Sequence, residues 1–257
     1  MTLITDPVFY LFAIPAVTFL GVSKGGFAGV GLLATPLLAL ILPPLQAAAI
    51  LLPILLLQDV ISVFVYRHDW DARNLKVMLP GAVIGVSAAW LLAAYVSDAY
   101  VRLTVGVIAF GFVMNYAFVQ ALAHRPVESR RPIARRGVFW GSVSGFTSTL
   151  CQAGGPPFQV YVLPQRLDKL TFVGTMAIFF AIINVMKVVP YFALGQFSTA
   201  GLTTSITLVP LAVVTNFLGI WLVRVTPTTT FYKLTYVLMF GVSIALIYSA
   251  LTDLLGR

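Results

Sequence analysis

Lys24 stands out because it is a charged residue in an otherwise apolar region. It lies in GVSKGGFAGVG, Gly21 to Gly31, a stretch with five glycines. A lysine in lipid costs about 2.5–3.5 kcal/mol on insertion scales unless it reaches water or a partner. Glycine breaks expose backbone N–H groups, which attract anions. Two interpretations are open: Lys24 with Gly25 and Gly26 binds an anion, or Lys24 extends to the membrane surface from a shallow break.

A second glycine-rich stretch offers neutral hydrogen-bonding groups. Thr149, Cys151 and Gln152 precede Gly154 and Gly155 in the sequence TLCQAGG. Hydroxyl, amide and backbone N–H donors suit the coordination of an oxyanion without added positive charge. The alternative is that these side chains satisfy the backbone of a broken helix.

Three further polar residues interrupt apolar runs. Asp59 follows Gln58, and Asn184 lies one helical turn before Lys187 on the same helix face. Asp59 is interpreted as a proton carrier, as a partner for one of the two lysines, or as a polar contact between helices. Lys187 is either a substrate or coupling contact, with Asn184 beside it, or an interfacial anchor.

The motifs of other chemistries are absent from the sequence. There is no GxxxxGK[ST] nucleotide loop, no HExxH and no CxxC. We therefore expect no metal, no cofactor and no catalytic residue, and any transport would use an ion or substrate gradient. An intramembrane enzyme would need a base beside Cys151, and neither histidine falls in an apolar run.

The elements that must position these residues are transmembrane helices. The chain of 257 residues is 60% hydrophobic and 9% charged, against about 25% charged in soluble domains. Its net charge of +8 is typical of membrane proteins with basic loops and does not indicate nucleic-acid binding. The sequence predicts spans in the runs 47–66, 76–96, 103–123, 170–186, 203–223 and 234–251.

A basic linker divides the chain into two similar halves. Five of the sixteen cations lie in residues 124–136, between a first repeat at 1–123 and a second at 137–257. Gly21 matches Gly145 at an offset of 124, Asp59 matches Asn184 at 125, and Pro80 matches Pro210 at 130. The ordered matches predict an internal duplication.

The charge distribution predicts that the halves are inverted. The positive-inside rule places the linker 124–136 in the cytoplasm. Residues 137–163 either enter and return or cross once, and the cations of the next loops favour the return. Residues 7–22 and 27–42 are each too short for a comfortable span. We therefore predict an all-α polytopic bundle of two inverted repeats, each a broken hairpin followed by three full helices, an architecture typical of secondary transporters.

The two glycine-rich segments resemble a known signature. GVSKGGFAGVGLLATPLL and GSVSGFTSTLCQAGGPPFQVYVL, together with LPGAVIG and LVPLAVVTNFLG, resemble the duplicated motifs of the sulfite exporter TauE/SafE family over essentially the whole chain. The first copy lacks the uninterrupted glycine triplet, and the second has only two adjacent glycines. The resemblance implies a permease of the bacterial cytoplasmic membrane that moves sulfite or related anions outward.

Three functions compete at this point. The leading hypothesis is a secondary anion transporter with alternating access at a midplane site between the two broken hairpins. The alternatives are a non-transporting membrane scaffold and an intramembrane enzyme that uses Cys151. Expected partners are a small anion and the lipid bilayer, and small-residue helix faces fit a homodimer as well as contacts within one protomer.

Overall fold

The computed structural model describes residues 6–27, 30–39, 41–42, 44–92, 95–123, 133–193, 195 and 197–255. All regular secondary structure in these residues is helical, as predicted. The helices are α1 (Pro7–Gly25), η1 (Val30–Leu33), α2 (Ala34–Ala39), α3 (Pro44–Val65), α4 (Ala72–Leu92), α5 (Asp98–Ala123), α6 (Ala134–Cys151), α7 (Gly155–Val162), η2 (Leu163–Gln165), α8 (Lys169–Ala193), α9 (Thr199–Thr207), α10 (Val209–Val225) and α11 (Thr228–Leu255). Of the predicted linker, residues 124–132 lie outside the described residues.

Several of these helices are long and apolar enough to cross a membrane. Five single helices qualify among the described residues: α1, α3, α4, α8 and α11. The pair α9 and α10 qualifies as a sixth span that bends by 51°. Since about 20 apolar residues are needed to cross the hydrocarbon core, the chain is a polytopic helical membrane protein.

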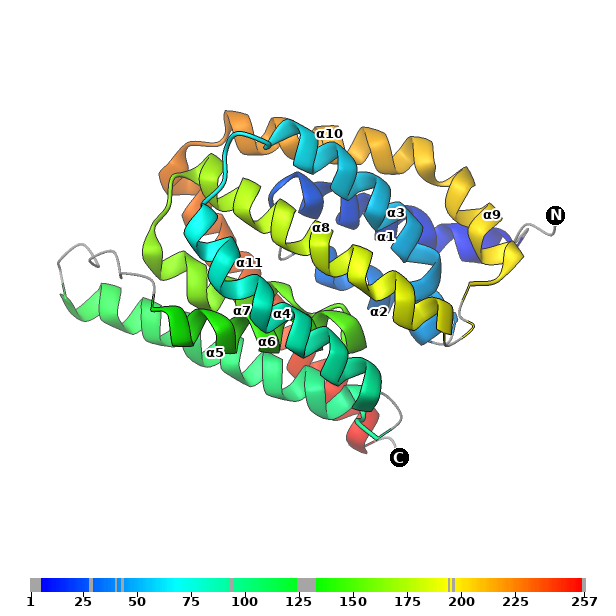
Figure 1. The fold of residues 1–257 in the computed structure, drawn as a ribbon, viewed down its shortest axis with the longest axis horizontal. Coiled ribbons are helices and arrows are strands. Elements are labelled where there is room, and N and C mark those ends of the chain that lie inside the picture. The colour runs from blue at the N-terminus through cyan, green and yellow to red at the C-terminus, as the bar shows by residue number, and fades with distance from the viewer. Residues whose placement is uncertain are drawn as a thin grey trace. The chain divides into compact units, whose positions relative to one another are not determined.

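The chain folds into two compact units. Unit 1 comprises Met1–Trp70 and Val173–Pro227, and unit 2 comprises Asp71–Phe172 and Thr228–Arg257. Unit 1 contains α1, α2, α3, α9, α10 and most of α8, whereas unit 2 contains α4 to α7 and α11 (Figure 1). Each unit is therefore built from both halves of the sequence.

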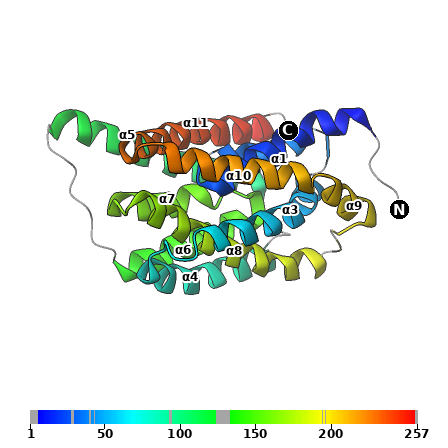
Figure 2. The same ribbon diagram turned by 90° about the horizontal axis from the view of Figure 1, so that it is seen from above.

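The two units use the same kind of helix pair. In unit 1, α1 packs along α10; in unit 2, α6 packs along α4 (Figure 2). The predicted repeat aligns α1 with α6, and it aligns α4 with α10 through Pro80 and Pro210. The same kind of helix pairing therefore occurs once in each unit. The inverted orientation of the two halves stays a prediction.

Helix α1 is longer than the sequence predicted. Asp6 caps it by accepting a hydrogen bond from Val8 N at 2.9 Å, and Pro7 occupies its first turn, where proline is tolerated. The expected end at Val22 is wrong: the helix continues through Lys24 to Gly25, and its 19 residues are sufficient for a span. The chain leaves the helix at Gly26, whose φ of 147° favours glycine.

The glycines of α1 serve close packing and do not break the helix. A Cβ on Gly21 would lie 2.0 Å from Thr215 Oγ1, and a Cβ on Gly25 would lie 2.3 Å from the Gly219 carbonyl carbon. Both partners belong to α10, so the two helices approach closely enough for backbones to touch. Small residues at a helix interface allow this approach in membranes.

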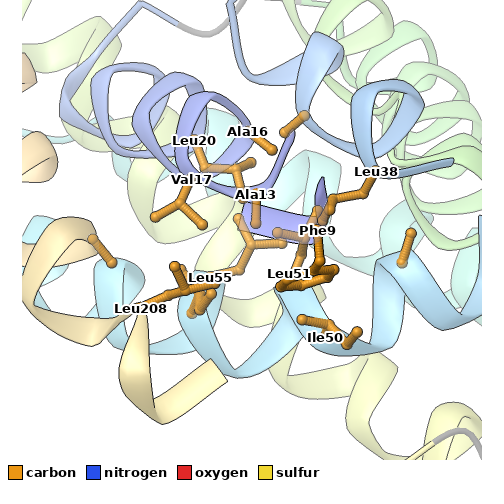
Figure 3. Close-up of a cluster of buried hydrophobic side chains, with 14 residues drawn as sticks. Phe9, Ala13, Ala16, Val17, Leu20, Leu38, Ile50, Leu51, Leu55 and Leu208 are labelled. Atoms are coloured by element: carbon orange, nitrogen blue, oxygen red, sulfur yellow. The ribbon is translucent and has the colours of Figure 1, made fainter. Parts of the chain in front are cut away.

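After α1 the chain turns back along it. A buried apolar cluster joins α1, α2 and α3, with Leu38 and Leu51 lying next to Phe9 (Figure 3). Because Leu38 of α2 packs at the level of the first turns of α1, the segment α1–α2 is a hairpin with a short second arm. This cluster packs the short second arm against α1 and α3.

The second glycine break is also a hairpin. Ser144 Oγ donates to Gly154 O at 2.7 Å, and Tyr161 Oη donates to Ile133 O at 3.3 Å, so α7 runs back toward the start of α6. This hairpin is the geometry expected if residues 137–163 enter the membrane and return, and their path through the membrane stays a prediction.

Candidate functional site

A polar cluster lies among α1, α3, α8 and α10 of unit 1. Lys24, in the last turn of α1, forms a close ion pair with Asp59 Oδ1 of α3. Asn184 Nδ2 of α8 donates to Asp59 Oδ2 at 2.7 Å. The Asp59 side chain is 4% exposed and the Lys24 side chain 12%. Asp59 therefore accepts from both partners inside the apolar bundle, one of the roles predicted for it.

The setting of Lys24 differs from the one expected from its glycine neighbours. It lies at the carboxyl end of a helix, where a cation complements the negative end of the helix dipole. Its Nζ also lies 5.9 Å from the centroid of the Phe180 ring. The Gly26 N–H donates to Ser23 O at 3.0 Å, so this amide is already used.

A second group of hydrogen bonds ties α3 to its neighbours. Ser62 Oγ donates to Lys24 O at 3.0 Å and lies 3.2 Å from Asn216 Oδ1. Asn216 Nδ2 donates to Gln58 O at 2.9 Å, and Gln58 Nε2 donates to Ala212 O at 3.2 Å. Gln58, Ser62 and Asn216 are fully buried, and their hydrogen bonds join α3 to α10 and to the last turn of α1.

Sequence reasoning missed Ser62, Asn216 and Tyr66 as members of this cluster. Tyr66, directly after α3, donates its hydroxyl to Gly25 O at 2.7 Å. The usable signal was polar residues at helical spacing, since Ser62 follows Gln58 by four positions on one face of an apolar helix.

Lys187 lies on the same face of α8 as Asn184 and is fully buried. This burial fits the predicted role of Lys187 as a substrate or coupling contact better than the alternative of an interfacial anchor. The described helices of unit 1 contain one acidic residue, Asp59, whereas Lys24 and Lys187 are both cationic. Two lysines and one aspartate give these three side chains a formal charge of +1.

The residues of the second glycine break lie in unit 2. Gln152 ends α6 with a left-handed φ of 56°, and its N–H donates to Thr147 O. Thr149 Oγ1 donates to Gly145 O at 2.8 Å, so its one proton is used by the helix backbone. Gly154 accepts from Ser144, Gly155 begins α7, and Cys151 is the last residue of α6.

Unit 2 has a polar core of its own that was not expected from the sequence. The amides of Asn74 and Gln165 donate to each other's oxygens at 2.9 and 3.0 Å, and Gln165 Nε2 also donates to Tyr161 O at 3.1 Å. These bonds join the start of α4 to the end of the α6–α7 hairpin. They satisfy buried amides and carry no charge, which indicates a structural role.

Comparison with known proteins agrees with the two motif copies and the helical architecture. The family model described as "Sulfite exporter TauE/SafE" matches residues 13–246. The chain belongs to this family. No curated protein and no solved structure matches it. The TauE/SafE match covers both glycine breaks and the Lys24–Asp59 pair, and the family is one of sulfite exporters.

Proposed function

We propose that this protein is a secondary transporter that exports small anions of the sulfite or organosulfonate type, and that Lys24, Asp59, Asn184 and Lys187 of unit 1 form its anion-binding centre. The observation that carries the proposal is the buried Lys24–Asp59 ion pair, together with a second buried lysine, Lys187, one helical turn after Asn184. An intramembrane ionisable residue is costly and is a functional-site candidate for that reason. The sulfite exporter family of the chain supports an anion as the substrate.

The proposed binding step is an exchange of partners. An entering oxyanion competes with Asp59 for the ammonium of Lys24, while Asn184 keeps its hydrogen bond to the carboxylate. Lys187 adds a second positive charge, so a singly charged anion neutralises the formal charge of the cluster. Asp59 balances Lys24 in the empty state, or it carries a coupling proton when the anion has replaced it. An inside-negative potential favours anion exit by about 2.3 kcal/mol per charge per 100 mV.

Other residues are proposed to offer an anion backbone and neutral contacts, each set within its own unit. In unit 1 these are Gly25 and Gly26, and in unit 2 they are Thr149, Cys151, Gln152, Gly154 and Gly155. The hydroxyl of Thr149 would have to release Gly145 O before it donates to an anion. Single substitutions of the unit 2 residues test this part of the proposal separately from the lysines.

The test combines binding and transport by the purified protein. Sulfite, sulfate, thiosulfate, short sulfonates and carboxylates are compared for thermal stabilisation, because a ligand of the folded state raises its stability by mass action. Efflux of the stabilising anion is then measured from proteoliposomes. Lys24→Met and Lys187→Met should each weaken binding about tenfold or more, as expected for a lost charge-assisted hydrogen bond.

The matched control is Arg67→Gln, which removes an exposed cation just beyond α3. It should bind and transport as the wild type does. Normal transport by a folded Lys24→Met, Lys187→Met double variant would disprove the proposed centre. Absence of any anion effect on the folded wild type would favour the scaffold function.

A further inference from the structure

Unit 2 contains a cavity that lies outside the proposed anion centre. Its volume is about 390 Å³, and it lies between the loop before α8 and the first turns of α11. The lining residues are Leu163, Arg166, Leu167, Asp168, Thr228, Thr229, Tyr232, Lys233 and Tyr236. Two segments that are distant in the sequence therefore build one cavity.

The polar part of the lining is cationic. Arg166 and Lys233 contribute two positive charges, and Asp168 contributes one negative charge. The Asp168 carboxylate is committed to the start of α8, because its Oδ2 accepts from Leu170 N at 3.0 Å. The excess positive charge and the guanidinium geometry of Arg166 suit a phosphate group.

Arg166 is held in an unusual backbone conformation. Its φ of 50° is left-handed, and its N–H donates to Leu163 O at 3.1 Å. Non-glycine residues rarely adopt this conformation, and it persists where the surrounding structure holds it. Arg166 therefore places a positive charge at the cavity, although the backbone conformation of this turn would suit glycine better.

The cavity wall is partly apolar and includes a hydrogen-bonded tyrosine. Tyr232 donates its hydroxyl to Leu167 O, and its ring lies 6.0 Å from the Phe172 ring and 5.6 Å from the Phe231 ring, measured between centroids. Leu163, Leu167 and Tyr236 add apolar surface. A ligand that combines a phosphate with an apolar tail complements both parts of the lining.

The cavity also lies at the ends of two candidate membrane spans. Lys169 directly follows the first lining segment, and Thr228 begins the second. Both are the first residues of candidate spans. Basic pockets at the ends of transmembrane helices attract anionic headgroups. We propose that this cavity is a binding site for a phosphate group, supplied by the headgroup of an anionic membrane lipid, with Arg166 and Lys233 as its ligands.

The test uses the purified full chain in a neutral detergent. Melting temperatures are measured with phosphatidylglycerol, phosphatidylcholine, inorganic phosphate and glycerol 3-phosphate. Phosphatidylglycerol at about 100 times its Kd should raise the melting temperature by about 5 °C or more, and phosphatidylcholine should not. A rise with glycerol 3-phosphate or phosphate alone would support the site with a soluble phosphate as its source.

The variants are chosen to keep the fold. Arg166→Gly removes the cation at a position whose φ suits glycine, and Lys233→Gln changes an exposed side chain. Both should melt near the wild-type temperature without lipid and lose the lipid-dependent rise. The control Arg135→Gln, Arg136→Gln removes two exposed cations at the start of α6 and should keep the rise. An equal rise in the cavity variants, or no rise with any phosphate, overturns the proposal.

Discussion

Asp59 joins three helices through one side chain. Its two oxygens accept from Lys24 of α1 and Asn184 of α8, while Asp59 itself belongs to α3. A carboxylate in this setting depends on its partners, because an unpaired buried charge is strongly unfavourable. The same dependence makes the pair sensitive to a competing anion, since a lysine that leaves Asp59 must find another negative group.

Neutralising Asp59 alone should destabilise the fold more than removing both charges of the ion pair. Asp59→Asn leaves Lys24 without its carboxylate and should lower the free energy of unfolding by about 3–5 kcal/mol. The double variant Lys24→Met, Asp59→Asn has no buried charge at this position and should be closer to wild type. Thermal unfolding of both variants and of Lys24→Met completes the cycle.

Anions should partly rescue the single variant. A bound anion can replace the missing carboxylate, so sulfite should stabilise Asp59→Asn more than it stabilises the wild type. If the double variant loses as much free energy of unfolding as the two single variants lose together, Lys24 and Asp59 contribute independently. That result would show that the ion pair does not stabilise the fold.

At the scale of elements, backbone contact between helices organises unit 1. Gly21 and Gly25 of α1 face Thr215 and Gly219 of α10 at distances that exclude a side chain. This approach brings the last turn of α1 against the end of α3, where two hydroxyl groups donate to the carbonyls of that turn. The position of Lys24 is thus a consequence of glycine packing on α10.

A methyl group at Gly25 should therefore separate α1 from α10. Gly25→Ala should lower the free energy of unfolding by about 1–3 kcal/mol, as overpacking does, and should reduce transport because Lys24 moves. The matched control is Gly241→Ala in α11, where nothing lies within 4 Å of the added Cβ. That variant should be more stable by about 0.5–1 kcal/mol, because alanine favours a helix over glycine.

Both changes are measured by thermal unfolding and proteoliposome efflux. If Gly25→Ala and Gly241→Ala changed the free energy of unfolding equally, the close contact between α1 and α10 would be contradicted. Only the helix propensity of alanine would then explain both results.

At the scale of the whole molecule, each compact unit is assembled from both halves of the chain. Unit 1 takes α1 to α3 from the first half and most of α8, α9 and α10 from the second, and unit 2 takes α4 and α5 from the first and α6, α7 and α11 from the second. Contacts between distant parts of the chain therefore hold each unit together. Either half expressed alone would lack the partners of α1 or α6.

The return of the α6–α7 hairpin makes a topological prediction. In a Cys151→Ser background, cysteines placed at Arg135 and Lys169 should react from the same side of the membrane, the cytoplasmic side by the positive-inside rule. A cysteine at Thr199 should react from the other side, because the 25 residues of α8 are sufficient to cross the bilayer. Labelling with an impermeant maleimide in oriented vesicles provides the measurement.

Opposite labelling of Arg135 and Lys169 would show that residues 137–163 cross once. The background variant is itself informative, because an enzyme that uses Cys151 as a nucleophile should be inactive without it. The proposed transporter should retain efflux, since serine keeps a hydrogen-bond donor for the anion at this position.

The sequence by itself determined the class of the protein and the identity of its buried charges. Long apolar runs have only the helix as a solution in lipid, since every backbone group must be satisfied internally. Lys24, Asp59 and Lys187 could be singled out because charges are rare in such runs. The duplicated glycine segments also predicted the family that the match over residues 13–246 confirms.

Only the tertiary structure decided how these features are used. Whether glycines end a helix or allow close packing depends on the partner helix, and α10 made Gly21 and Gly25 packing residues. The choice of Lys24 as the partner of Asp59 depends on the distance between side chains 35 positions apart. No local propensity encodes that distance, because it arises from the joint packing of α1, α3 and α10.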